Sequence, residues 1–371
     1  MIAKSRGILV LALFLAQVLV LPVVARQTGQ SSESGSPCPT TVTAASELPA
    51  ATLEQIQHGG ELDSVGNYEA DIRSKLMASG FGELDLLAEY LRSSKERFPG
   101  GAWKLDKFYA GLGVPRYGSG SPDSDWLPQL EKLRQWAAQE PDSLTAHIAL
   151  ALGMVHSAWR ARTGNFAKDV KADSWPVFYS RLNEARNILN SIAANRASDP
   201  QWFATMIQIA MGQNWNQAQF SQTFEEAISI EPLYTRTYIT AATFLLPRWH
   251  GKAGDDANLM FEARQRLGGK EGSALYYFIG DSVAGYYSGR AVVTDAKVCW
   301  EWMKQGYLDA ESLYGSSLLQ MNTMAKRLGE FDEKPMSKWL FTRIGDRWAS
   351  NIWHEKQFFE RVRDWAFSTG S

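Results

Sequence analysis

Apolar residues recur at steps of three and four along most of the chain beyond residue 60. One run that places its members on a single helix face consists of Leu144, Ile148, Leu152, Val155 and Trp159. Four further runs repeat this spacing: residues 84–91, 178–192, 234–245 and 314–328. The alternation of apolar and polar residues that is typical of strands is not sustained anywhere in the sequence. The pattern therefore predicts an all-α fold.

Prolines and capping residues indicate where the predicted helices begin and end. Pro141, Pro232 and Pro247 each follow a helical run, and a proline at such a place ends a helix. Asp199 precedes Pro200, which combines a capping side chain with a proline at the first helical position, and Ser143 can cap in the same way. The resulting helix pairs recur at intervals of roughly 32–37 residues, the range of tetratricopeptide-type repeats.

Residues 224–232, FEEAISIEP, form the best-preserved hairpin of this pattern. Phe224, Ala227 and Pro232 have the spacing of the second helix of a tetratricopeptide repeat. The first-helix signature is absent, because its Trp, Leu, Gly and Tyr positions hold Ala204, Ile207, Gln208 and Met211. We therefore expect an irregular α-α helical-hairpin solenoid, a tetratricopeptide-like superhelix, in which neighbouring hairpins supply each other's core.

The first 25 residues have the order of a secretory signal peptide. Lys4 and Arg6 precede an apolar run from residue 8 to 21, and small residues lead to Ala25. We expect cleavage after Ala25 and a periplasmic or secreted protein. The alternative is an uncleaved anchor, since residues 8–25 just reach the roughly 18 residues that a membrane span needs. Gln17 and Pro22 argue against the anchor, and we expect no membrane span after cleavage.

The composition places a flexible tether after the signal peptide. We expect the tether to cover residues 26–60. Residues 26–50 are rich in Ser, Thr, Gly, Pro and Gln, and such a segment cannot bury enough apolar surface to pack. The predicted helical domain then covers residues 61–371. Loss of Lys4 and Arg6 would change the formal charge from −2 to −4. A mildly acidic chain without a basic run argues against nucleic acid as a partner.

The two cysteines are Cys38, in the predicted tether, and Cys299, in a helical pattern. An oxidising compartment would allow a disulfide between them. We favour a buried Cys299 thiol and an exposed Cys38, because unpaired cysteine is common in protein cores. No spacing of Cys or His residues is typical of a metal site, so we expect neither a metal nor a cofactor.

Several aromatic segments resemble a bacterial family catalogued as domain of unknown function 4034. They are residues 103–112 (WKLDKFYAGL), 144–162, 175–189 (WPVFYSRLNEARNIL), 199–210, 245–255 (LLPRWHGKAGD), 344–353 and 359–366. The resemblance would cover roughly residues 80–367, and it implies a helical, tetratricopeptide-like protein. The family has no established activity, so the resemblance assigns no catalytic residue.

The chain contains 14 tryptophans, spread along the predicted helices. They follow the apolar stripes, which favours a role as packing wedges between helices. The alternative is a groove lined with tryptophan that binds a glycan or a peptide.

The loop after Pro247 is the strongest candidate for a binding role. Arg248, Trp249 and His250 are followed by Asp255 and Asp256, which gathers a guanidinium, an indole, an imidazole and two carboxylates behind one helix end. Loops held by rigid elements often carry function. The structural alternative is that one aspartate caps the next helix and Arg248 bonds the carbonyls of the previous one.

A second cluster contains Tyr277 and Asp281, one helical turn apart. The simpler interpretation is a buried aspartate bonded to tyrosine hydroxyls. A hydrolase with paired carboxylates would need a second acid close by, such as Glu301 or Asp309.

The sequence thus supports two hypotheses of different classes. The first is an exported solenoid that acts as a protein- or peptide-binding scaffold in the cell envelope, since stacked hairpins offer a concave surface. The second is an α/α-type extracytoplasmic enzyme that acts on glycans, with Asp281 and the 248–256 loop at one pocket. A pocket that brings two carboxylates together beside tryptophans would favour the enzyme.

Overall fold

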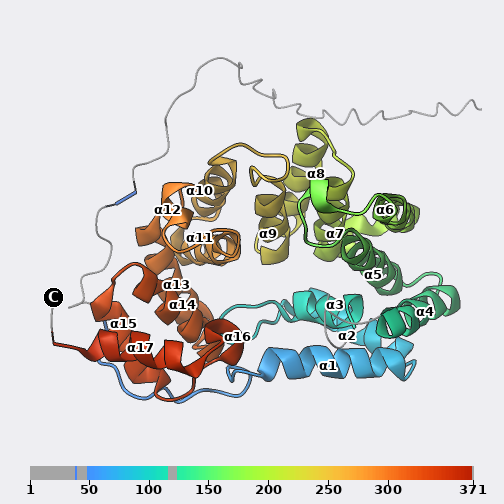
Figure 1. The fold of residues 1–371 in the computed structure, drawn as a ribbon. Helices are drawn as coiled ribbons and strands as arrows, with labels where there is room; N and C mark the ends of the chain where they lie inside the picture. Colours follow the sequence, from blue (N-terminus) through green and yellow to red (C-terminus); the bar gives the residue numbers. More distant parts are fainter. Residues whose placement is uncertain (1–37, 40–47, 116–122, 370–371) are drawn as a thin grey trace, which may run out of the picture. The chain divides into compact units, whose positions relative to one another are not determined.

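The computed structural model describes residues 38–39, 48–115 and 123–369. Their secondary structure is helical, apart from an isolated antiparallel bridge between Arg97 and Trp103. The predicted all-α class is therefore confirmed for this part of the chain (Figure 1). The predicted signal peptide, residues 1–25, lies outside the described residues. Among the residues that are described, no helix has the length and apolar character needed to cross a membrane.

One hydrophobic cluster is formed by the helices of the N-terminal half, with contributions from Ala227 and Tyr234. These helices are α1 (Ser64–Met77), α2 (Phe81–Ser94), α3 (Lys104–Gly113), α4 (Asp123–Gln139), α5 (Leu144–Arg162), α6 (Ser174–Ser191) and α7 (Pro200–Gly212). The predicted caps are present, since the side chains of Ser143 and Asp199 accept backbone N–H groups of α5 and α7. These caps satisfy donors that the first turn of a helix leaves without a partner.

A second hydrophobic cluster is formed mainly by the helices of the C-terminal half. They are α8 (Gln217–Ile230), α9 (Thr235–Phe244), α10 (Asp255–Leu267), α11 (Gly269–Ala284), α12 (Ala291–Thr294), α13 (Trp300–Tyr314), α14 (Leu318–Glu330), α15 (Lys334–Ile344), α16 (Ser350–Trp353) and α17 (Lys356–Phe367). Alternate helices form a row: α5 packs against α7, α7 against α9, α9 against α11 and α11 against α13. The intervening helices α6, α8 and α10 pack on their neighbours in the chain.

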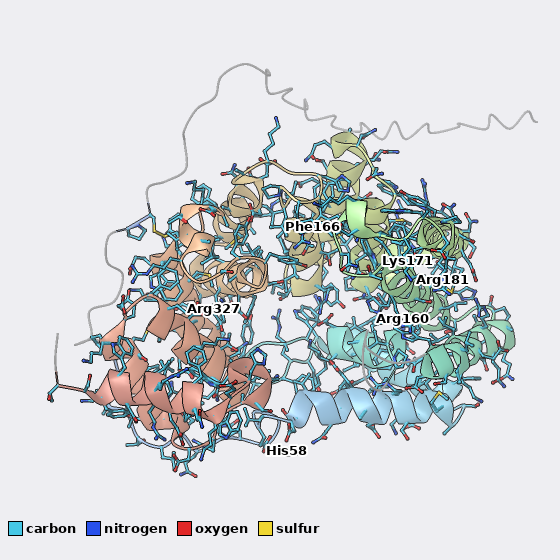
Figure 2. All side chains as sticks on the ribbon, viewed as in Figure 1. His58, Arg160, Phe166, Lys171, Arg181 and Arg327 are labelled. Atoms are coloured by element: carbon cyan, nitrogen blue, oxygen red, sulfur yellow. A yellow bond between two sulfur atoms is a disulfide. The ribbon has the colours of Figure 1, made fainter. Side chains whose placement is uncertain are left out.

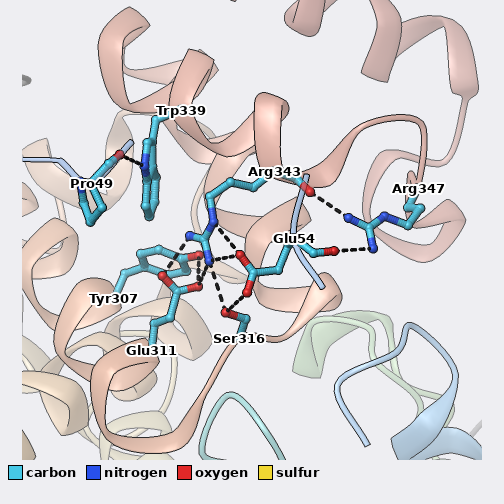
Figure 3. Close-up of polar contacts among 8 residues, drawn as sticks. All are labelled: Pro49, Glu54, Tyr307, Glu311, Ser316, Trp339, Arg343 and Arg347. Atoms are coloured by element: carbon cyan, nitrogen blue, oxygen red, sulfur yellow. Dashed lines mark hydrogen bonds and ion pairs between the residues drawn. The ribbon is translucent and has the colours of Figure 1, made fainter. Parts of the chain in front are cut away.

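Residues 48–60 pack against the C-terminal helices, and we call them the N-terminal strap. The Trp339 indole donates to the Pro49 carbonyl at 2.8 Å. Glu54 accepts two hydrogen bonds from Arg343, at 2.9 and 2.7 Å, and its carbonyl accepts from Arg347 (Figure 3). The strap is thus fixed to the domain, unlike the flexible tether that was expected to extend to residue 60. Besides its polar contacts, Leu48, Ala51 and Ile56 pack against the C-terminal core.

Arg343 stands at the centre of the contacts that fix the N-terminal strap. Its side chain is only 8% exposed and lies between the carboxylates of Glu54 and Glu311, with nitrogen–oxygen distances of 2.7 to 2.9 Å. Burial would raise the pKa of Glu54, but the hydrogen bonds from Arg343 and Ser316 outweigh it and lower that pKa. The strap is thus attached through an ion pair that bridges both ends of the described chain.

A disulfide joins Cys38 to Cys299, with 5.5 Å between the two Cα atoms. The preference for two free thiols is therefore wrong. Cys299 is 5% exposed, as expected for a core cysteine, but its position immediately before α13 also places its sulfur beside Cys38. A buried cysteine can also form a disulfide, so the apolar pattern around Cys299 could not decide between a free thiol and a disulfide.

Candidate functional site

Three adjoining hollows lie along α5, α7, α9 and α11. The aromatic pocket, about 370 Å³, is lined by residues of α5, α6 and α7 and by Arg248, Trp249 and His250. The bridging pocket, about 340 Å³, shares Trp159, Met211 and Trp249 with it. The charged pocket, about 260 Å³, shares Arg236 and Ile239 with the bridging pocket. The hollows thus adjoin through shared lining residues, and we call the three together the groove.

Arg162, the last residue of α5, is the central group of the aromatic pocket. Its side chain is 7% exposed, and its guanidinium lies over the rings of Trp159, Trp175 and Trp249 at 5.6, 5.4 and 5.3 Å. A cation at this distance from an aromatic face is attracted by the ring's electrons. Burial, and then the charge of Arg248, lower the pKa of Arg162. The guanidinium is thus held in place by aromatic faces.

Arg248 adds a second, exposed guanidinium to the aromatic pocket. It lies 5.8 Å from the centre of the Trp249 ring and 5.7 Å from those of Phe166 and Tyr286. Among the described residues its contacts are with these rings, and it makes no hydrogen bond to the carbonyls of the preceding helix, the structural role predicted for it. The Trp249 ring therefore lies close to two guanidinium groups, those of Arg162 and Arg248.

Local packing explains why the loop after α9 brings Arg248 and Trp249 to this place. A Cβ at Gly251 would overlap the Leu245 carbonyl, so the tight return of the chain requires glycine there. His250 Nε2 lies 2.8 Å from the Met211 carbonyl oxygen and must donate to it, and its ring packs on Phe244. His250 thus fastens the loop to α7, and it is not placed as a catalytic base.

Asp255 and Asp256 start α10 and do not line the three hollows. The Asp255 carboxylate accepts the Lys252 backbone N–H at 2.7 Å, which is a turn-forming contact. Asp256 is completely buried, and neither of its carboxylate oxygens makes a hydrogen bond of good geometry. Burial raises the pKa of Asp256 to about 6, more than the backbone N–H groups at the helix start lower it.

Replacing Asp256 by asparagine should remove a pH-dependent loss of stability. Above pH 4 the unfolded carboxyl ionises, whereas the folded one stays protonated until about pH 6. The folded state therefore loses stability as the pH rises through this window. We expect the stability of Asp256→Asn relative to the wild type to increase by roughly 2–3 kcal/mol between pH 4 and 7.5. Urea unfolding at the two pH values measures this difference, and a difference that does not change with pH would contradict it.

The charged pocket contains an aspartate that no sequence motif had singled out. Asp106 of α3 pairs with Arg236 of α9 through two contacts of 2.6 and 3.0 Å. Burial would raise the pKa of Asp106, but the charges of Arg236 and Lys107 outweigh it and hold that pKa well below its usual range. Asp106 therefore remains ionised at neutral pH and stabilises the contact between α3 and α9.

Tyr277 and Asp281 also line the charged pocket. Asp281 does not bond a tyrosine hydroxyl as the simpler interpretation proposed. Its carboxylate accepts from Arg327 of α14 at 2.8 Å, and its carbonyl accepts from the same guanidinium at 3.1 Å. Figure 2 labels Arg327 among the C-terminal helices. The Tyr277 hydroxyl is buried without a hydrogen-bond partner, and burial raises its pKa well above the usual value.

The acids proposed as partners of Asp281 do not line the charged pocket. Glu301 pairs with Lys304 at 2.9 Å, and Asp309 is buried on α13. Asp106 is the second carboxylate in this hollow. Across the described ranges, no group of three or more side chains could hold a metal ion.

Part of the chain is similar to a known family. Residues 69–224 match the family model of a domain of unknown function, DUF4034. No curated protein matches the chain, and no solved structure matches it either. The DUF4034 match begins within α1 and ends within α8. It agrees with the resemblance found in the sequence, but it does not include the segments from residue 245 onwards.

The DUF4034 segment supplies only part of the groove. Arg162 and the tryptophans at 159 and 175 lie within it, as does Asp106, whereas Arg248, Trp249 and Asp281 lie beyond it. Of the residues singled out in the sequence, Arg248, Trp249 and His250 line the aromatic pocket and Tyr277 and Asp281 the charged pocket. Each of these hollows shares lining residues with the bridging pocket. Trp136 is buried in the core, as expected of a packing residue, whereas Trp159, Trp175 and Trp249 line the aromatic pocket.

Proposed function

We propose that the chain is an exported, tetratricopeptide-like solenoid that binds an extended protein or peptide segment in the cell envelope. The adjacency of the aromatic, bridging and charged pockets, which share lining residues, carries this proposal, because an extended ligand needs adjoining subsites. The packing of α5, α7, α9 and α11 in a row, with α6, α8 and α10 on their neighbours, supports the solenoid.

The disulfide supports export. Disulfides persist in the periplasm and outside the cell, whereas the cytosol of most organisms keeps thiols reduced. Cys38 and Cys299 are joined, and the described part of the chain contains no free cysteine. This agrees with a signal peptide that ends at Ala25.

The glycan-hydrolase alternative has one observation in its favour, which is that Asp106 and Asp281 line the same hollow. Each carboxylate is held by an arginine, Asp106 by Arg236 and Asp281 by Arg327. A glycosidase needs one carboxyl with a raised pKa to protonate the leaving group, and the pKa of Asp106 is lowered instead. Binding is therefore the better-supported function.

The test starts from the full-length gene, expressed with export. The purified protein should begin at Arg26, and a retained Met1 in the membrane fraction would contradict cleavage. A library of labelled linear peptides is then screened by fluorescence polarisation. Ile239→Arg should weaken the selected peptides at least about tenfold, because Ile239 lines both the bridging and the charged pocket.

Leu86→Arg is the matched control for this substitution. Leu86 is also an aliphatic residue on a helix, but it is 70% exposed on α2 and lines none of the three pockets. It should leave peptide affinity unchanged, while circular dichroism checks that both variants are folded. The absence of any selected peptide, or equal losses in the two variants, would refute the proposed function.

A further inference from the structure

The aromatic pocket holds two positive charges for which the described residues supply no counter-charge. Arg162 uses one terminal nitrogen to donate to the carbonyls of Thr163 and Asn165, both at 3.1 Å. Within the described residues, no carboxylate lies at ion-pair distance from Arg162 or from Arg248, and none lines this hollow. Arg236, which lines the other two hollows, differs because it pairs with Asp106.

Such an arrangement is unfavourable for a site whose only task is packing. Arg162 as a residue is only 7% exposed, and burial removes hydration from its charge, which an acidic partner normally replaces. The nearby charge of Arg248 adds repulsion to the burial. The Trp249 indole N–H is also buried without an acceptor. The pocket therefore has donors and positive charge in excess of the acceptors that it supplies.

The walls of the pocket further restrict the ligand. Trp159, Trp175 and Trp249 surround Arg162 with flat apolar faces. A planar guanidinium pairs with a carboxylate through two parallel hydrogen bonds, and the adjoining indoles can cover carbon atoms next to that group. The complementary chemistry is thus a carboxylate attached to an apolar or aromatic body.

We propose that the aromatic pocket binds a carboxylate of a peptide ligand, with Arg162 and Arg248 as its recognition residues. The choice of a peptide rests on the proposed function, whereas the choice of a carboxylate rests on the charges of the pocket. The carboxylate comes either from the C-terminus of the peptide or from an acidic side chain.

Nuclear magnetic resonance of the full chain with ¹⁵N-labelled tryptophan separates these sources. Trp249 is the reporter because its ring lies within 5.3 Å of the Arg162 guanidinium and 5.8 Å of that of Arg248, and Trp249→Phe assigns its indole signal. The probes are N-acetylphenylalanine, the α-amide of N-acetylglutamic acid, N-acetylphenylalaninamide and glucuronate. We expect saturable shifts with the first probe, the second, or both, and none with the neutral amide.

Arg248→Gln should weaken binding of the active probe at least about tenfold, the usual effect of losing a hydrogen bond to a charged group. Arg248 is exposed, so this variant should fold normally. Arg134→Gln, an exposed arginine of α4 outside the groove, is the matched control and should bind like the wild type. Equal binding of the neutral amide, binding of glucuronate alone, or no effect of Arg248→Gln would overturn the inference.

Failure of the carboxylate pocket can be distinguished from failure of the proposed peptide binding. Library peptides that depend on Ile239 but not on Arg248 would leave peptide binding in place and remove the carboxylate pocket. A carboxylate probe that depends on Arg248, without any library peptide that depends on Ile239, would establish the pocket and refute the extended peptide groove.

Discussion

Replacing Cys38 and Cys299 together by serine should lower the free energy of unfolding by roughly 3–5 kcal/mol. The disulfide closes a loop of 261 residues, so its removal greatly increases the number of conformations open to the unfolded chain. The folded state keeps the N-terminal strap, whose contacts do not involve sulfur. Denaturant unfolding of both proteins measures the difference.

The wild-type protein treated with a reductant is the matched comparison for the double serine variant. Both lack the cross-link, so their unfolding midpoints should agree, and reductant should leave the variant unchanged. A loss below about 1 kcal/mol in the variant would mean that the unfolded state retains the constraint by other means.

Arg343→Met should cost about 3–5 kcal/mol, because removing one partner of a buried ion pair leaves the others uncompensated. Methionine retains much of the side-chain length but leaves the carboxylates of Glu54 and Glu311 without their ion-pair partner. The pKa of Glu54 is lowered in the folded protein, so the wild-type pair loses stability as the pH falls through the carboxyl range. The variant should lose less over the same range. Thermal and urea unfolding at neutral and acidic pH provide the measurement.

Arg134→Met supplies the control for an arginine that pairs in solvent. Its partner, Glu184, lies 3.3 Å away, and both side chains are about half exposed. Pairs of this kind contribute at most about 1 kcal/mol. Adding Glu54→Gln to Arg343→Met should restore part of the lost stability, since it removes one of the two negative charges that have lost their partner. Equal costs for Arg343→Met and Arg134→Met would contradict the importance assigned to the buried pair.

Periodicity and helix-capping chemistry were sufficient to predict the fold class. The stripe from Leu144 to Trp159 lies in α5, and Ser143 and Asp199 cap the helices that they were expected to cap. These signals are local, because a helix satisfies its backbone within a few residues of sequence. The N-terminal strap escaped prediction because it is held by a pairing between Glu54 and Arg343, 289 residues apart.

The candidate site was predictable only where its residues are neighbours in sequence. Arg248 and Trp249 lie together after a helix end and could be singled out, and they line the aromatic pocket. Arg162 and Trp175 reach that pocket from other helices, and Asp106 meets Arg236 across 130 residues. Contacts between residues so far apart in sequence depend on how the helices pack, and the local patterns of a single sequence do not specify that packing. His250 and Asp255 belonged to the same motif, yet their contacts serve the loop itself.

The link between Cys38 and Cys299 determines how the protein would carry tension. A pull applied between the segment before Cys38 and the C-terminus passes through the sulfur–sulfur bond directly to the start of α13. The stretch from residue 39 to 298 is outside that load path, and it contains the whole lining of the aromatic pocket. A ligand held there would therefore experience little of a force transmitted along the chain.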